Sequence, residues 1–85
     1  MYTVELRRNA LNALEKLPER ERQRIIPVLL NLETEPRPKD VEKIKGTELW
    51  RVRIGDYRVV YAINDKEKIV TIVRIGNRRE IYRNL

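Results

Sequence analysis

The sequence predicts an α+β domain in which a helical hairpin packs on one face of a small, mainly antiparallel sheet. Apolar residues alternate with other residues in 2–6, and three further strand-like segments follow residue 48. Between these regions, residues 9–33 carry apolar residues at helical spacing, interrupted by prolines. A Gly-Asp pair separates the first two of the later segments, as in a tight hairpin turn. The expected element order is therefore β-α-α-β-β-β.

Length and composition exclude several classes of protein. The chain has 85 residues, which suits one domain spanning residues 1–85. It has no cysteine and no histidine, which removes disulfides, thiolate metal sites and the commonest general base. No segment resembles a signal peptide or approaches the roughly 20 apolar residues of a membrane span. We therefore expect a cytoplasmic protein that contacts no membrane and uses no metal or cofactor.

The N-terminal half predicts one strand and the first helix. Residues 2–6 alternate between polar and apolar side chains, which predicts a short strand. Residues 9–17 follow as a helix for which Asn9 is a plausible N-cap. Pro18 suits the first turn of a new helix, so Leu17-Pro18 is the expected corner of the hairpin. The apolar stripe of the first helix comprises Ala10, Leu14 and Leu17.

The second helix is expected from Pro18 to about Glu33. Pro27 lies inside it, and a proline there removes a backbone hydrogen bond, so we expect a bend between Gln23 and Pro27. Residues 33–48 contain two prolines and many charges, which indicates a connector. The core stripe of this helix is expected to comprise Ile25, Ile26, Leu29, and either Leu30 or Leu32.

Three strands follow, at residues 49–54, 57–63 and 69–75. Gly55-Asp56 indicates a two-residue type II′ turn, which fixes the register of the first two strands. Residues 69–75 are apolar on both faces, so this strand is expected inside the sheet. The expected cross-strand pairs are Ile54 with Tyr57, Arg53 with Arg58, Val52 with Val59, Arg51 with Val60, and Trp50 with Tyr61.

This register gives the hairpin one apolar face and one basic face. Arg53 directly opposes Arg58, and such like-charged pairs destabilise a sheet by up to about 1 kcal/mol. A solvated face or a protected edge explains one or two arginines. It does not explain an opposed pair, with Arg51 nearby, beside the small residues Val60 and Ala62. Arginine favours a bidentate grip on phosphate or carboxylate, so we predict a shallow basic floor that binds an anion.

The C-terminal residues extend the predicted site. If they fold beside the basic floor, Arg78 and Tyr82 join it. Tyr82 then stacks on a base or donates a proton, although a packed terminal aromatic remains open as an alternative. Arg79 and Arg83 are interpreted as solvated. A face this rich in arginine suits a polyanion or an acidic peptide, and the net charge of the chain is +6.

Several motifs resemble the RelE/ParE superfamily of toxins. They are "ALNALEKLPERERQRI", "KIKG", "LWRVRIGDYRVVYAI" and "IVRIGNRREIY". The resemblance implies a toxin of a type II toxin–antitoxin system, with a cognate antitoxin as its partner. RelE-like members enter the ribosomal A site and cut mRNA without a metal. The ribose 2′-OH attacks the adjacent phosphate and leaves a 2′,3′-cyclic phosphate. The functional residues of that family fall on Arg51, Arg53, Arg58, Arg78 and Tyr82.

The sequence also departs from that family. RelE-type enzymes often carry lysines where this chain has Arg51 and Arg53, and an arginine is a poor general base. Other ribonucleases of the superfamily use a histidine and a glutamate, and this chain has no histidine. We therefore expect catalysis by positioning and charge stabilisation, with protons handled by Tyr82 or a ribosomal group. Glu48 and Glu80 are candidate bases, but the interpretation as surface carboxylates is favoured.

Three alternatives remain open at this point. ParE-like members share the fold and inhibit DNA gyrase, but they generally lack the full basic and aromatic set. A degenerate relative would keep the fold without activity. A general nucleic-acid-binding module would show salt-sensitive binding without cleavage.

Overall fold

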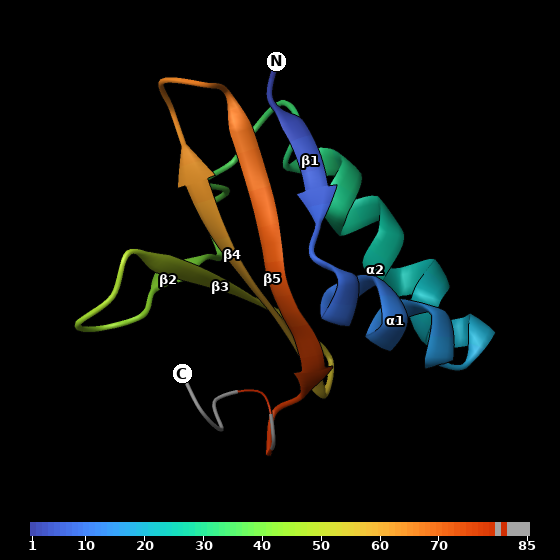
Figure 1. The fold of residues 1–85 in the computed structure, drawn as a ribbon. Coiled ribbons are helices and arrows are strands. Elements are labelled where there is room, and N and C mark those ends of the chain that lie inside the picture. The colour runs from blue at the N-terminus through green and yellow to red at the C-terminus, as the bar shows by residue number, and fades with distance from the viewer. Residues whose placement is uncertain (80, 82–85) are drawn as a thin grey trace.

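The computed structural model describes residues 1–79 and residue 81. Its elements are β1 (Thr3–Leu6), α1 (Arg8–Lys16), α2 (Glu19–Asn31), β2 (Glu42–Lys43), β3 (Leu49–Ile54), β4 (Tyr57–Asn64) and β5 (Ile69–Asn77). Both helices lie on one side of the sheet (Figure 1), so the α+β prediction is confirmed. Within the described part of the chain, no helix is long and apolar enough to cross a membrane.

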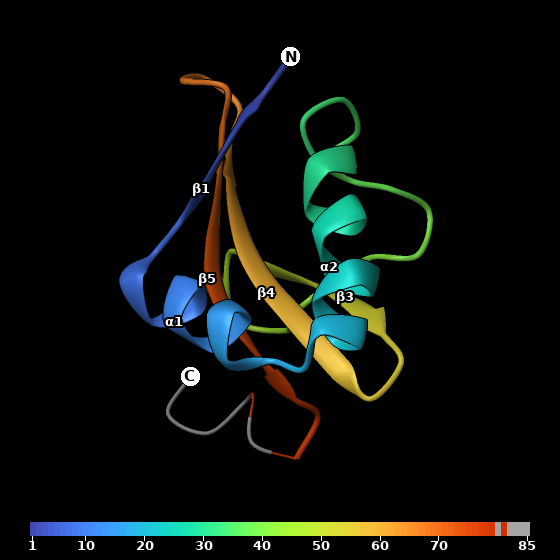
Figure 2. The same ribbon diagram turned by 90° about the vertical axis from the view of Figure 1, so that its right-hand side faces the viewer.

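The sheet is mixed and has one more strand than expected. Its five strands run in the order β1-β5-β4-β3-β2. β1 pairs with β5 in parallel, and the other neighbours are antiparallel. β5 lies between β1 and β4, which confirms the interior strand, and Figure 2 looks onto the helices with α1 over β5. The additional strand is β2, which pairs with the edge of β3 inside the predicted connector.

The β3–β4 hairpin has the predicted register. All five expected pairs occur, from Ile54 opposite Tyr57 to Trp50 opposite Tyr61. The turn has a positive φ of 59° at Gly55 and none at Asp56, as type II′ geometry requires. An added Cβ would lie 2.8 Å from the Arg24 guanidinium, but this is the end of a flexible, half-exposed side chain that can move aside. The backbone conformation is therefore what requires glycine at this position.

The main core lies between the helices and the sheet. Tyr61 and Val59 of β4 are fully buried there against Ile25 of α2. The expectation for Ile26 was wrong, because 41% of that residue is exposed, and Leu30, one of two open choices, is 58% exposed. The buried residues in this region lie on one helical face at the spacing i, i+4, i+7. They are Ile25 and Leu29 of α2 and Leu32, which directly follows the helix.

Two local predictions about the helices have different outcomes. Asn9 does not cap α1, because the helix begins one residue earlier and the Asn9 side chain donates instead to the Val73 carbonyl of β5 at 3.1 Å. Pro18 precedes α2 directly, which confirms the corner, and Arg22 closes it by donating to the Leu17 carbonyl at 2.7 Å. Pro27 lies inside α2, and the expected bend stays a prediction.

The connector before β2 is fastened to the sheet at two points. The buried Tyr61 hydroxyl donates to the Pro36 carbonyl at 2.8 Å. Arg37 forms two hydrogen bonds with Asp65 at 3.2 and 2.8 Å, and its guanidinium lies 5.3 Å from the centre of the Trp50 ring. The Tyr2 hydroxyl donates to the same Asp65 carboxylate. These contacts bring the connector to the edge of β3, where β2 can pair.

The Tyr61 hydrogen bond gives a first testable prediction. Tyr61→Phe leaves the Pro36 carbonyl without this donor, so we expect it to lower the free energy of unfolding by about 1–3 kcal/mol in urea titrations. Tyr2→Phe is the matched control, because it also removes one hydroxyl but leaves Asp65 bound to Arg37 at an exposed site. Its effect should be clearly smaller than that of Tyr61→Phe, because water replaces the lost hydrogen bond at an exposed site. Equal losses in both variants would contradict the anchoring role of Tyr61.

Candidate functional site

A pocket of about 510 Å³ lies on the face of the sheet that is turned away from the helices. It brings together four of the five predicted site residues and adds Arg79, which the sequence had indicated as solvated. The fifth, Tyr82, lies outside the described residues, as do Glu80 and Arg83. The pocket is lined by Asp40, Glu42, Arg51, Arg53, Arg58, Arg78 and Arg79.

The opposed arginines of the hairpin occupy different environments. Arg58 is only 8% exposed, and its Nη1 donates to the carbonyls of Gly55 and Tyr57 at 3.1 and 3.0 Å. Arg53, its cross-strand partner, is exposed. The turn carbonyls thus hold one guanidinium in place, while the other extends into solvent. This arrangement reduces the like-charge repulsion that the register imposes.

Arg51 is held by a carboxylate that was not predicted. Glu42 of β2 lies directly opposite Arg51 of β3, and Arg51 Nη2 donates to Glu42 Oε2 at 2.7 Å. This hydrogen bond and the charge of Arg51, with a smaller effect of Arg53, lower the pKa of Glu42. Glu42 is therefore ionised at neutral pH. The sequence missed it because β2 has only two residues and no alternation of its own.

The candidate base Glu48 is not part of the pocket. Its side chain is 95% exposed and pairs with Lys43 at 3.6 Å. The surface interpretation of Glu48 is therefore confirmed. Among the residues that the structure describes, no group of three or more His, Cys, Asp or Glu side chains is placed to hold a metal ion.

Arg78 is tied to the hairpin turn by its backbone. Its amide donates to the Asp56 carbonyl at 3.0 Å, so the segment after β5 lies beside the β3–β4 turn. The next amide, of Arg79, donates to Oδ1 of Asn77 at 3.0 Å. A second hollow of about 440 Å³ continues the pocket here and is lined by Asp56, Asn77, Arg78 and Arg79.

The other half of this face is not the open floor that the sequence predicted. Val60 is fully buried in a second apolar cluster with Val73 and Ile81, against which Ala62 packs. A bulge in the β4–β5 pairing, between Val60 and Tyr61, leaves Val73 without a partner in register, and Val73 contacts this cluster. The basic surface is therefore confined to the half of the sheet near the hairpin turn.

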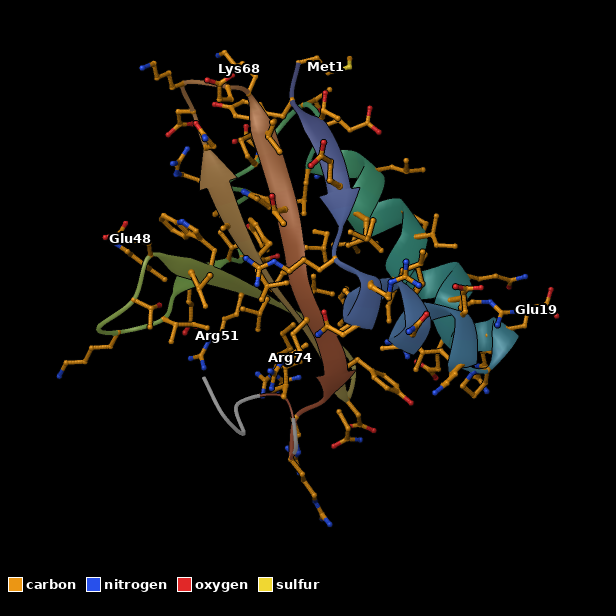
Figure 3. The ribbon with its side chains drawn as sticks, in the orientation of Figure 1. Met1, Glu19, Glu48, Arg51, Lys68 and Arg74 are labelled. Atoms are coloured by element: carbon orange, nitrogen blue, oxygen red, sulfur yellow. The ribbon has the colours of Figure 1, made fainter. Side chains whose placement is uncertain are left out.

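Arg74 is a further arginine on this face that sequence reasoning did not single out. It lies opposite Val60, which in turn lies opposite Arg51, so these residues form one row across three strands. Its Nη1 is 3.4 Å from the Ile81 carbonyl. Figure 3 shows Arg51 and Arg74 on the side of the sheet away from Glu19 of α2. The bulge sets this row, which is why the sequence pattern did not reveal it.

Comparison with known proteins identifies the family. Residues 4–82 match the family described as ParE toxin of type II toxin-antitoxin system, parDE. RelE1 of Methanocaldococcus jannaschii is 33% identical over 98% of this chain and 97% of its own length. The chain belongs to the RelE/ParE toxin superfamily. The toxin RelG of Mycobacterium tuberculosis is 33% identical over 96% of this chain and 97% of that protein.

A solved RelE structure shows the same fold. In the archaeal RelE–RelB complex from Pyrococcus horikoshii OT3, the matched chain has a TM-score of 0.82 and 36% identity. The match covers 93% of the present chain and 97% of the other. The family that the hairpin motifs indicated is therefore confirmed, together with its fold.

The Arg51–Glu42 pair gives a second prediction. Because Arg51 lowers the pKa of Glu42, Arg51→Gln should raise that pKa toward the ordinary value of about 4.3. The pKa is measured by following the Glu42 side-chain carboxyl carbon by NMR as a function of pH. Arg53→Gln is the control and should cause a smaller rise, since only its more distant charge is lost. An unchanged pKa in Arg51→Gln would refute the pairing.

Proposed function

We propose that this protein is the toxin of a type II toxin–antitoxin system and that it cuts mRNA in the ribosomal A site. The observation that carries the proposal is the pocket, which is lined by arginines at the positions matching the RelE pattern. The similarity to RelE-type proteins over nearly the whole chain supports the same reading. Residues 1–85 act as one domain, in the cytoplasm where ribosomes are found.

The arginines suit phosphate chemistry. When a ribose 2′-oxygen attacks the neighbouring phosphorus, negative charge builds on the phosphate oxygens, and fixed cations stabilise that charge. Arg58 is suited to this role because the turn carbonyls hold its guanidinium before substrate arrives. Arg53 of β3 and Arg78, which directly follows β5, are both exposed and line the pocket. Arginine stays protonated, so these residues bind and stabilise rather than accept protons.

The ribosome supplies what the pocket lacks. With no histidine in the chain, the reaction depends on holding the 2′-oxygen, phosphorus and leaving oxygen in line, and the A site imposes that geometry on mRNA. Tyr82 or a ribosomal group completes the proton transfers. The reaction needs no metal, and its products are a 2′,3′-cyclic phosphate and a 5′-hydroxyl.

The third prediction is translation-dependent cleavage. Inducing the protein in cells should produce new 5′-hydroxyl ends within ribosome-bound mRNA, whereas purified RNA alone should be cut slowly. Both are measured by mapping 5′ ends, with DNA supercoiling followed in the same cultures. Gyrase-dependent DNA breaks with intact mRNA would contradict the proposal and favour the ParE-like alternative.

The same assay ranks the arginines. Arg78→Ala should reduce the cleavage rate by about 10²-fold or more, the scale for removing one transition-state donor. Arg58→Ala should do the same and should also lower stability, because Arg58 is buried against two carbonyls. Arg20→Ala, an exposed arginine of α2, is the control and should keep full activity. Loss of activity in the Arg20 variant alone would contradict the assigned site.

We also propose a cognate antitoxin that neutralises the pocket. An antitoxin segment presents Asp or Glu to the arginines and lays apolar residues on the helical hairpin, where Leu11, Ile26 and Leu30 are exposed. Val60 is not available to this segment, because that residue is fully buried. We take the RelB chain of the archaeal RelE–RelB complex as its analogue in the solved relative.

The fourth prediction tests that partner. Binding of the antitoxin encoded beside the toxin should raise the melting temperature, abolish cleavage and weaken as salt rises. Arg53→Glu should weaken binding in calorimetric titrations, because it places a negative charge in the pocket. Lys66→Glu makes the same charge change between β4 and β5, outside both the pocket and the helical hairpin, and should bind almost normally. Unchanged affinity of the Arg53 variant would mean that inhibition acts elsewhere on the toxin.

A further inference from the structure

We propose that the second hollow, beside the hairpin turn, binds the base of a nucleotide next to the scissile phosphate and favours bases with an exocyclic amino group over uracil. The inference rests on the proposed ribonuclease function and adds a specificity site to it. The hollow measures about 440 Å³ and shares Arg78 and Arg79 with the main pocket. A nucleotide that flanks a phosphate in the main pocket would therefore reach it. Its other lining residues are Asp56 and Asn77.

The hollow differs from the main pocket in its hydrogen-bonding groups. Cations bind phosphate whatever the RNA sequence, whereas the edges of bases are read by hydrogen-bond donors and acceptors. Asp56 supplies acceptor oxygens, and the amide of Asn77 supplies a donor. Both side chains are exposed. The hollow therefore offers a donor and an acceptor beside two cations, which suits a base attached to a phosphate backbone.

The backbone fixes which end of the Asn77 amide is available. Its Oδ1 atom accepts a hydrogen bond from the Arg79 backbone N–H at 3.0 Å. A flipped amide would place its NH₂ group against that N–H, so the hydrogen bond assigns the donor to the opposite end. Nδ2 makes no hydrogen bond within the part of the chain that the structure describes. Asn77 thus presents a donor to any ligand in the hollow.

The hairpin turn supplies the acceptor. The Asp56 carbonyl accepts from the Arg78 amide at 3.0 Å, and this bond brings the turn beside the segment that carries Asn77. The Asp56 carboxylate forms neither a hydrogen bond nor an ion pair with any residue in 1–79 or with residue 81. Its oxygens are therefore available to a ligand, although two arginines line the same hollow.

This pair of groups distinguishes uracil from the other bases. Adenine, cytosine and guanine each present an amino group, which can donate to the carboxylate, and an acceptor on the same edge, which can accept from the amide. Uracil presents a single N–H between two carbonyl oxygens. At least one of those oxygens would face the carboxylate of Asp56, and the repulsion disfavours uracil.

The first test compares cytosine with uracil, which are the same size, at each position next to the cut in mRNA on purified ribosomes. At one position, the wild type should cut the cytosine substrate about 10-fold faster. Asp56→Asn keeps a residue that suits the turn after glycine and can donate to a uracil oxygen, so the ratio should fall close to one. Glu48→Gln also neutralises an exposed carboxylate, but outside the hollow, and should keep the wild-type ratio.

A second test does not depend on cleavage. The side-chain amide resonance of Asn77 is followed by NMR during titration with 2′-O-methyl trinucleotides of cytidine or uridine, which cannot be cut because the 2′-hydroxyl is blocked. The cytidine trinucleotide should shift this resonance more than the uridine one, and Asp56→Asn should remove the difference.

The outcomes separate the base site from the ribonuclease function. Equal rates for the two substrates in the wild type, or an unchanged preference in Asp56→Asn, would overturn the base site and leave cleavage intact. Absence of wild-type cleavage, with different shifts for the two trinucleotides, would overturn the ribonuclease function and leave a site that selects bases. Absence of cleavage together with equal shifts would overturn both.

Discussion

The two-residue turn at Gly55-Asp56 is the constraint on which the rest of the structure depends. It sets the register of β3 and β4, and that register decides which side chains meet the helices. A shift of one residue would move Val59 and Tyr61 out of the core and bring arginines into it. The same turn also builds the site, because its carbonyls accept hydrogen bonds from the Arg58 side chain and the Arg78 amide. Folding and the geometry of the pocket therefore share one local element.

The parts of the fold predicted from sequence are those with a local signal. Alternation and the glycine turn are visible in a few residues, and so the hairpin register, the interior strand β5 and four members of the arginine pocket could be predicted. β2 has no such signal, because its two residues become a strand only by pairing with β3. Glu42 was missed for that reason. The covering of Val60 was missed because it depends on a bulge and on Ile81 from beyond β5.

In the helices, the sequence alone could not decide which apolar residues are buried or where α1 begins, because tertiary packing determines both. The sequence of α2 allows two overlapping apolar stripes, and contact with the sheet selects the one that contains Ile25 and Leu29. Ile26 and Leu30 then remain on the outer surface. Asn9 is a good cap by type, but its side chain meets a sheet carbonyl instead, because α1 begins before it. Local preference is a weak guide wherever a residue has a tertiary alternative of similar energy.

The pocket brings several arginines close together, and their mutual repulsion lowers the stability of the fold. The protein offsets part of this repulsion with its own groups: backbone carbonyls hold Arg58, and a carboxylate across the sheet holds Arg51. Arg53 and Arg78 remain exposed and line the same pocket. Under the proposed function, an incoming phosphate would pair with these arginines and meet groups that are already held in position. This is the condition under which fixed charges stabilise a transition state more than they do in water.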